Sequence, residues 1–327
     1  MKYSTLVAFI LAASAGAAAQ AQVPPDLAAQ IAKIGRTIDV QATAKLYAPL
    51  QPAKEPYRGV SVSRDLMYGA DPKQALDLFA PTAKAAAPRT VLIYVHDGGY
   101  VRGDKRPASS PFYDNVMLWA TKNGMVGVNM NYRLAPQNQY PAAQEDIASV
   151  IAWVKANIAR YGGDPERIFL MGHSAGAAHI GTYMSHPQFH AGGSDGVRGA
   201  IMSSGVYTVE APAPLPAGAA AGGAGGRPAG QGHPYFGADT TKYAEYASVK
   251  GLVASKTPMI FLTAELDPPM FNKEFGKIVA AKCETGSCPD VAFLKHHGHI
   301  SGNYAINTAD VSLTGPVLEF IHRYEAR

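Results

Sequence analysis

Short, almost continuously apolar runs alternate along this chain with segments that carry apolar residues at helical spacing. Runs of this kind are typical of strands buried on both faces, and their alternation with helices predicts βαβ units around a mostly parallel sheet. We therefore expect an α/β fold with a doubly wound sheet and helices on both faces. The expected strands span residues 76–79, 90–95, 125–130, 168–171, 200–203, 259–263 and 291–294, and the expected helices span 142–158, 175–184, 271–281 and 315–324.

The size and composition of the chain fit one catalytic-sized domain. It has 327 residues, of which 47% are hydrophobic and 17% charged, so it can bury a large core without resembling a membrane protein or a disordered one. We place this domain at residues 58–327. The formal net charge of +4 is not gathered into a run of Lys or Arg, and we expect no nucleic-acid partner.

Residues 1–21 have the pattern of an export signal. Lys2 is followed by an apolar stretch at residues 6–13 and by an Ala-Gln-Ala cleavage site at residues 19–21. A membrane anchor is the alternative, but the stretch is shorter than the roughly 20 apolar residues that a span needs. We expect cleavage before Gln22, a periplasmic or secreted mature protein, and no stable membrane insertion after cleavage.

Two further segments differ from the rest of the chain in composition. Residues 22–57 contain Ala-rich helical patterns and end in a proline-bounded stretch, which predicts a small N-terminal helical cap. Residues 211–232 consist almost entirely of Ala, Gly and Pro, a composition that cannot build a core. We expect a flexible insertion at the carboxyl-end rim of the sheet, where it either acts as a lid over a pocket or has no role.

The two cysteines, Cys283 and Cys288, lie close together in the sequence. Export would place them in an oxidising compartment, so we predict a disulfide between them. The alternative is a pair of free thiols. The spacing is a weak signal for a metal site, because no second pair of ligands follows it.

The strongest local motif is Gly-His-Ser-Ala-Gly at residues 172–176, which follows the apolar run 168–171 and precedes a helical pattern. Strand, tight turn and helix form the context that a nucleophile elbow requires, since the glycines leave room for a strained turn that exposes the serine hydroxyl. The start of the helix also favours a developing negative charge. We predict that Ser174 is a nucleophile; the alternative is an ordinary turn.

A serine nucleophile needs an orienting acid and a base, which follow it along the chain in that order. Asp267 comes after the apolar run 259–263, at the carboxyl end of an expected strand, and the prolines that follow it fix an exposed turn that can aim its carboxylate. We predict that Asp267 is the acid. Glu265 is the nearby alternative.

The base is expected in the loop between the last expected strand and the C-terminal helix. We predict His299, because Gly298 permits the sharp turn that projects the next side chain. His296 and His297 are alternatives from the same loop. The three histidines could instead form a surface cluster or a metal site, but no acidic or cysteine ligands accompany them.

Acyl transfer also needs hydrogen-bond donors for an oxyanion. His-Asp-Gly-Gly at residues 96–99 directly follows the expected strand 90–95. Adjacent glycines let the backbone N–H groups of Gly98 and Gly99 face a substrate at close range, and the N–H of Ala175, next after the nucleophile, is the third expected donor. An ordinary glycine turn is the alternative.

These motifs occur in order with Asn-Tyr-Arg-Leu-Ala-Pro at residues 131–136 and Pro-Ala-Ala at 141–143. In this combination the chain from about residue 60 onward resembles the bacterial hormone-sensitive-lipase-like esterases and the neighbouring feruloyl-esterase and arylformamidase-like hydrolases. The resemblance implies an α/β-hydrolase fold with a canopy of helices, carboxylic-ester hydrolysis, and oxyanion donors at Gly98, Gly99 and Ala175. It departs at Asp97, where these enzymes usually have glycine, and a carboxylate there weakens an oxyanion hole unless it points away.

The predicted function is that of a serine carboxylesterase that hydrolyses a small-molecule ester, short-chain or aryl, through an acyl-enzyme formed by Ser174, Asp267 and His299. This chemistry requires no cofactor and no metal. Two alternatives stay open: an arylformamidase-type amidase that uses the same machinery, and a catalytically inactive hydrolase fold that binds a ligand or partner. The sequence predicts neither the acyl length, nor the leaving group, nor the oligomeric state.

Overall fold

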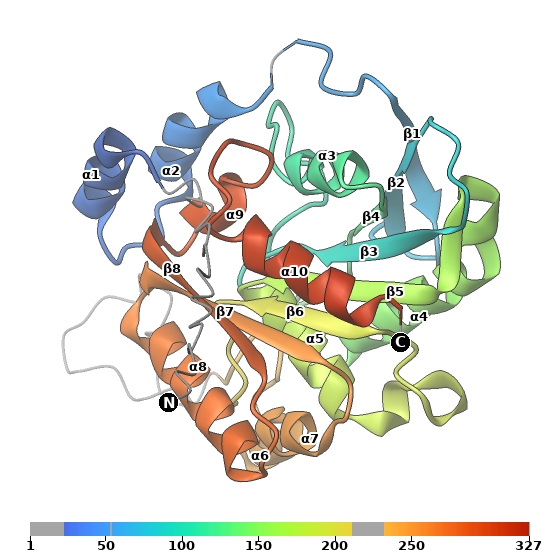
Figure 1. Ribbon diagram of the computed structural model, residues 1–327. Coiled ribbons are helices and arrows are strands. Elements are labelled where there is room, and N and C mark those ends of the chain that lie inside the picture. Colours follow the sequence, from blue (N-terminus) through green and yellow to red (C-terminus); the bar gives the residue numbers. More distant parts are fainter. Residues whose placement is uncertain (1–22, 53, 211–231, 327) are drawn as a thin grey trace, which may run out of the picture.

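The computed structural model describes residues 23–52, 54–210 and 232–326 (Figure 1). The expected export signal at residues 1–21 lies outside the described residues, as does the expected insertion at 211–232 apart from Gly232. Within the described ranges, no helix is both long enough and apolar enough to cross a membrane.

An eight-stranded sheet in the order β1-β2-β4-β3-β5-β6-β7-β8 runs through the described part of the chain. β2 pairs antiparallel with β1 and with β4, and the other neighbouring pairs are parallel. The predicted strands and the mostly parallel sheet are confirmed. The strands are β1 (Val60–Met67), β2 (Ala75–Pro81), β3 (Arg89–Val95), β4 (Val126–Met130), β5 (Gly163–His173), β6 (Gly199–Ser203), β7 (Met259–Leu266) and β8 (Asp290–Gly298).

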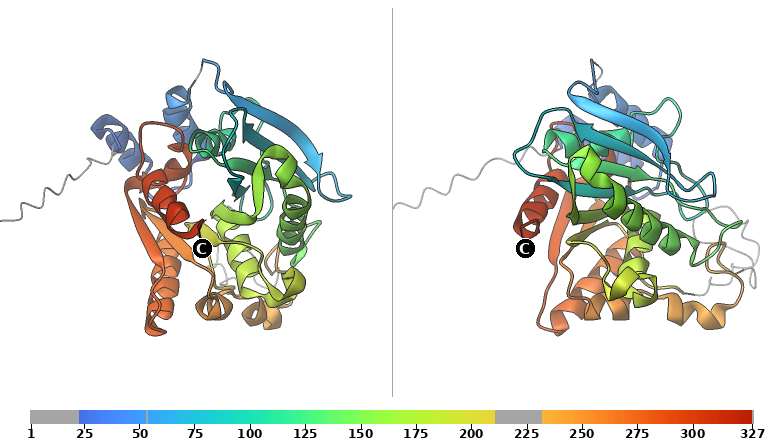
Figure 2. Two further views of the ribbon diagram at one scale, coloured as in Figure 1. Left: turned by 45° about the vertical axis from the view of Figure 1, so that its right-hand side comes forward. Right: turned by 90° about the vertical axis from the view of Figure 1, so that its right-hand side faces the viewer.

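Helices cover both faces of the sheet, as predicted (Figures 1 and 2). The helices are α1 (Pro25–Ile34), α2 (Val40–Tyr47), α3 (Asp114–Lys122), α4 (Ala142–Asn157), α5 (Ala175–Ser185), α6 (Tyr243–Tyr246), α7 (Val249–Ala254), α8 (Pro269–Glu284), α9 (Ser301–Tyr304) and α10 (Thr314–Tyr324). Leu92 and Tyr94 of β3 belong to the apolar cluster with α3 and α10, whereas Val91, Ile93 and Val95 belong to the cluster with α4, α5, α7 and α8. The two-residue alternation of side chains along one strand therefore builds two apolar cores.

Among the elements that had no counterpart in the predicted strands and helices are α3 and β1. Every residue of α3 from Asp114 to Thr121 is buried, so this helix has no polar stripe that would give it a helical period in the sequence. β1 is a half-exposed edge strand whose pairing with β2 shifts between Ser63 and Leu66, so it lacks the continuous apolar run of the inner strands.

The first two helices pack beside the loop that follows β8 (Figure 1). Asp39 begins α2, because its Oδ1 accepts a hydrogen bond from the N–H of Ala42 at 2.8 Å. Ile31 of α1 and Tyr47 of α2 are buried in one small apolar cluster with Ile300 and Tyr304. The N-terminal segment therefore supports the region that contains His299.

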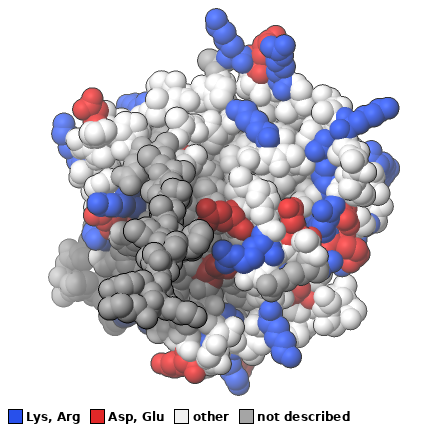
Figure 3. Space-filling model, in the orientation of Figure 1, with Lys and Arg blue, Asp and Glu red and all other residues white. Residues whose placement is uncertain are grey.

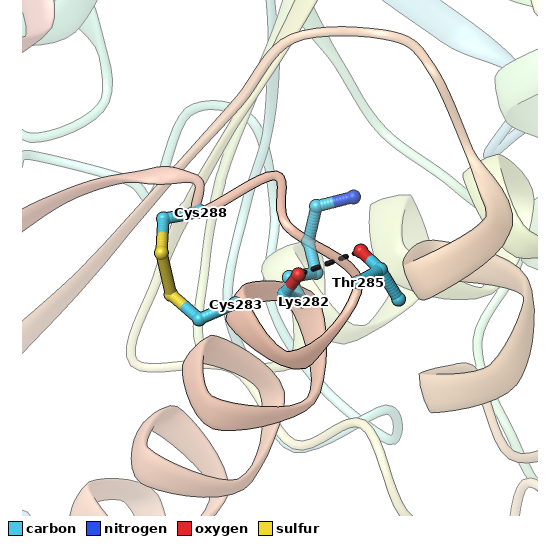
Figure 4. Close-up of a disulfide and its surroundings, with 4 residues drawn as sticks. All are labelled: Lys282, Cys283, Thr285 and Cys288. Carbon is cyan, nitrogen blue, oxygen red and sulfur yellow. Dashed lines mark hydrogen bonds between the residues drawn. A yellow bond between two sulfur atoms is a disulfide. The ribbon is translucent and has the colours of Figure 1, made fainter.

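A disulfide joins Cys283, near the end of α8, to Cys288, just before β8 (Figure 4). The Cα atoms of the two cysteines are 4.2 Å apart. Beside it, the hydroxyl of Thr285 donates a hydrogen bond to the carbonyl oxygen of Lys282 at 2.7 Å, which ends the helix. The predicted disulfide is confirmed, and it closes the turn that leads from α8 into the last strand.

Charged side chains of both signs are interspersed on the face shown in Figure 3. Several buried charges have partners of opposite sign. Asp77 of β2 is fully buried and lies 2.7 Å from the guanidinium of Arg64 and 2.7 Å from the ammonium of Lys105. Arg64 also reaches Asp114 at the start of α3, at 2.6 Å. These pairs join β1, β2 and α3 at the opposite end of the sheet from β7 and β8.

Candidate active site

Ser174 stands in a sharp turn between the end of β5 and the first residue of α5. Its backbone has φ 53° and ψ −118°, a region that a residue with a side chain occupies only under strain. A Cβ added at Gly176 would lie 2.1 Å from the carbonyl oxygen of Val95, and one added at Gly172 would lie 2.7 Å from the carbonyl carbon of Gly176. Both glycines are therefore needed, because α5 starts directly against the ends of β3 and β5.

The structure brings Ser174, His299 and Asp267 into one chain of hydrogen bonds. His299 Nε2 lies 2.9 Å from Ser174 Oγ, and His299 Nδ1 lies 2.7 Å from Asp267 Oδ1. The three residues follow β5, β8 and β7, whose carboxyl ends meet at one edge of the parallel part of the sheet. This geometry allows the imidazole to accept the serine proton while the carboxylate holds the ring.

The carboxylate of Asp267 is held by more than His299. Its Oδ2 accepts hydrogen bonds from Ser204 Oγ at 2.7 Å, from the N–H of Ala264 at 2.7 Å and from Thr263 Oγ1 at 3.1 Å. Burial by itself would raise the pKa of Asp267, but the hydrogen bonds and charge of its neighbours, His299 first, lower it below the ordinary value. Asp267 is therefore an anion with a fixed orientation.

Residues beyond the sequence motifs complete this support, and reasoning from the sequence missed them. Arg36, just after α1, donates to the carbonyl oxygen of Asp267 and, at 2.9 Å, to Oδ1 of Asn272. Ser204 follows β6, and the N–H of Ser174 donates to the neighbouring carbonyl of Ser203 at 2.9 Å. The position of Ser204 after a buried strand was the signal that could have found it, whereas nothing in the sequence points to Arg36.

The rival residues of the sequence analysis lie elsewhere. Glu265 accepts the N–H of His296 at 2.6 Å, and its carboxylate is 3.6 Å from the ring of His296. His297 is fully buried between Ser301 Oγ, 2.9 Å from its Nδ1, and Asp310 Oδ2, 3.1 Å from its Nε2. The three histidines of this loop therefore face three different sets of partners.

The environment of His299 favours the neutral ring. Burial has the largest effect and lowers its pKa; the hydrogen bond to Asp267 raises it, and the neighbouring His173 lowers it again. The net result is a pKa below the ordinary value. A neutral imidazole can accept a proton, which is the state that a base needs at neutral pH.

The turn at residues 96–99, called the oxyanion turn below, has the conformation that exposes backbone donors. Gly98 and Gly99 have φ of 133° and 60°. A Cβ at Gly98 would lie 1.8 Å from the carbonyl oxygen of Arg102, so this position requires glycine. Among the described residues, the N–H groups of Gly98, Gly99 and Ala175 have no hydrogen-bond partner, which leaves them available to a substrate oxygen.

Asp97, the residue that departs from the resemblance, is occupied by protein donors. Tyr113 donates its hydroxyl to Oδ1 at 2.6 Å, and Nδ1 of His173 lies 2.8 Å from Oδ2. Burial would raise the pKa of Asp97, but the hydrogen bond and charge of His173, with the hydrogen bond of Tyr113, lower it to about 2. Both of its oxygens are therefore bound within the protein.

Aromatic side chains gather beside the oxyanion turn. Tyr100, directly after Gly99, stacks on Tyr235 with ring centroids 5.3 Å apart. Its edge contacts with His233 and Phe236 have centroid distances of 5.1 and 5.7 Å. Tyr100 thus packs against His233, Tyr235 and Phe236, which follow the Ala/Gly/Pro segment in the sequence.

Several solved structures with a similar fold are esterases. A bacterial heroin esterase matches 93% of this chain and 98% of its own, with a TM-score of 0.63 and 22% sequence identity. An arylesterase matches 93% of this chain and 100% of its own, with a TM-score of 0.63 and 14% identity. The chain has the α/β-hydrolase fold. The predicted fold is confirmed.

The sequence of the chain also matches named relatives. Residues 76–190 match the BD-FAE family model. Esterase LipC of Mycobacterium tuberculosis is 33% identical over 131 residues, 39% of this chain and 32% of that protein. The probable carboxylic ester hydrolase LipM of the same organism is 30% identical over 200 residues, 58% of this chain and 45% of that protein. The chain thus spans less than half the length of either relative. Its predicted resemblance to this esterase group is confirmed.

Proposed function

We propose that this α/β-hydrolase is a serine carboxylesterase that hydrolyses short-chain or aryl carboxylic esters. The observation that carries the proposal is the hydrogen-bonded chain from Ser174 through His299 to Asp267, with distances of 2.9 and 2.7 Å. A serine hydroxyl is a weak nucleophile alone, and a neutral histidine held by a buried carboxylate is the arrangement that activates it.

In the proposed reaction, Nε2 of His299 takes the proton of Ser174 as Oγ attacks the ester carbonyl. The N–H groups of Gly98, Gly99 and Ala175 donate hydrogen bonds to the oxyanion of the tetrahedral intermediate. His299 then gives the proton to the departing alcohol, which leaves an acyl-serine. A water molecule deprotonated by His299 hydrolyses that ester and regenerates Ser174. The steps use side chains and backbone alone, with no cofactor and no metal.

The proposed substrate is a small-molecule ester. The named relatives are an esterase and a carboxylic ester hydrolase, and the similar structures are a heroin esterase and an arylesterase. Tyr100 and Phe236 supply aromatic surface next to the oxyanion turn, which favours an aromatic acyl or leaving group.

The test combines turnover with labelling of the nucleophile. Purified enzyme is assayed on p-nitrophenyl esters of graded acyl length and on a formanilide, and is treated with a fluorophosphonate probe. We expect ester hydrolysis and one adduct on Ser174, both absent from Ser174→Ala. Faster turnover of the formanilide would make the enzyme an amidase, and absence of both labelling and turnover would make it an inactive hydrolase fold.

We also propose that the mature protein is exported. The pattern of residues 1–21 and the disulfide between Cys283 and Cys288 support this location, because disulfides persist in oxidising compartments. Cell fractionation with N-terminal sequencing tests it: we expect a periplasmic or secreted protein that begins at Gln22. A cytoplasmic protein that retains Met1 contradicts it.

A further inference from the structure

His173, the residue before the nucleophile, has an acceptor on each side of its ring. Nδ1 lies 2.8 Å from Asp97 Oδ2, and Nε2 lies 2.7 Å from the carbonyl oxygen of His299. The His173 side chain is 2% exposed, so water does not compete for either nitrogen. One buried ring thus joins the oxyanion turn to the loop of the base.

Each nitrogen of His173 faces an acceptor. A carbonyl oxygen can only accept, so Nε2 donates to the carbonyl of His299. Asp97 accepts the hydroxyl of Tyr113 on its other oxygen and its pKa is lowered to about 2, so the oxygen that faces Nδ1 belongs to a carboxylate. His173 and Asp97 therefore form a hydrogen-bonded pair inside the protein.

We propose that His173 and Asp97 are positioning residues that hold the oxyanion turn and the backbone of His299 in register around Ser174. The inference rests on the proposed esterase function and explains why this chain has a carboxylate beside its oxyanion donors. Neither residue is assigned a contact with the reacting atoms. Each acts through a catalytic group: Asp97 through the neighbouring Gly98 and Gly99, and His173 through His299.

The pair also sets the electrostatic surroundings of the base. The ring centroids of His173 and His299 are 4.8 Å apart, so a cation on His173 opposes protonation of His299, while Asp97 favours it. The other titratable groups around the pair include His96 and the phenols of Tyr94, Tyr113, Tyr132 and Tyr304. Removal of His173 alone leaves the Asp97 carboxylate without this partner and should make His299 easier to protonate.

The first test uses variants that separate charge from geometry. His173→Phe keeps the ring but has no N–H donor; we expect kcat to fall about 100-fold with little change in KM, because groups around the reacting atoms are misplaced. The acid limb of the pH profile should move up by about one pH unit.

Asp97→Asn keeps a neutral hydrogen bond, since its amide can donate to Nδ1 while Nε2–H still donates to the carbonyl of His299. We expect most of kcat to remain in this variant.

His190→Phe is the matched control. His190 bonds the carbonyl oxygen of Tyr183 near the C-terminal end of α5, away from Ser174 at its start, and its replacement should leave kcat and the pH profile unchanged. If wild-type enzyme is active but His173→Phe keeps both its kcat and its acid limb, the inference is wrong and the proposed function stands. If wild-type enzyme neither hydrolyses esters nor reacts with the probe, the proposed function itself is wrong.

The second test needs no turnover. Nitrogen NMR of ¹⁵N-histidine-labelled wild-type protein reports which ring nitrogen carries a proton, and the His173 signals are those altered in Asp97→Asn. We expect Nε2 of His173 to carry a proton that is hydrogen-bonded to the carbonyl of His299. An unprotonated Nε2 would overturn the inference.

Discussion

Ser204 Oγ donates a hydrogen bond of 2.7 Å to Oδ2 of Asp267, the carboxylate oxygen that His299 does not use. The neighbouring carbonyl of Ser203 accepts the N–H of Ser174. The end of β6 therefore holds Ser174 with one residue and Asp267 with the next.

The Ser204 contact predicts a graded loss of activity. Ser204→Ala removes one donor from a buried carboxylate that keeps the donors Ala264 and Thr263, and we expect kcat/KM to fall about tenfold, or about 1.4 kcal/mol. Thr263→Val should cost less, since its bond is longer. Steady-state kinetics measure both, with Ser185→Ala as a control serine that bonds only near the end of α5. Equal activity of Ser204→Ala and wild type would show that Asp267 does not need this donor.

Loss of the nucleophile or the base should abolish turnover. We expect Ser174→Ala and His299→Ala each to lower kcat about a million-fold, the scale seen when such a unit is broken. His296→Asn is the matched control from the same loop: His296 has φ 64°, which Asn tolerates, and its side chain is half exposed. An active His299→Ala enzyme together with an inactive His297→Ala enzyme would assign the base to His297.

The pH dependence follows from the buried base. Activity needs the neutral ring of His299, whose pKa is lowered by burial, so kcat/KM should rise with pH and reach its plateau through a midpoint below the ordinary histidine value of about 6.5. The sign is fixed because a lowered pKa keeps the base deprotonated to lower pH. A pH profile of kcat/KM measures this midpoint. A midpoint above about 6.5 would contradict the conclusion that burial lowers the pKa of His299.

Substitution of alanine for two glycines should change the free energy of unfolding in opposite directions. Gly176→Ala places a Cβ 2.1 Å from the carbonyl oxygen of Val95, and we expect it to lower the free energy of unfolding by about 1–3 kcal/mol. Gly276→Ala, within α8, meets no atom within 4 Å and should raise that free energy by about 0.5–1 kcal/mol. Denaturant unfolding compares them, and a stable Gly176→Ala protein would show that α5 can shift.

The disulfide should contribute to stability and not to chemistry. Its loop is short, so replacement of Cys283 and Cys288 by Ser should lower the free energy of unfolding by about 2 kcal/mol in the chain-entropy model, with kcat unchanged. Thermal melts and kinetics of the double variant test this. Intact mass with two alkylatable thiols in protein purified from the periplasm would show that the bond does not form in the cell.

The sequence predicted the inner strands, because each is a continuous apolar run, and it missed α3, which is buried on every side and shows no helical period. It named Ser174, Asp267 and His299 because a short motif or a strand end marks each one. Arg36 and Tyr113 could not be found in this way. Their roles depend on contacts with Asp267 and Asp97 that only the folded chain creates.

The contact between Arg36 and Asp267 joins residues that are 231 positions apart. The base loop likewise rests on α1 and α2 through Ile300 and Tyr304. A chain in which the elbow has formed but the N-terminal helices have not docked would lack this support for the acid and the base. We therefore expect activity to appear last during refolding, after the sheet has formed. The rate at which turnover appears would then report how fast α1 and α2 dock against the loop after β8.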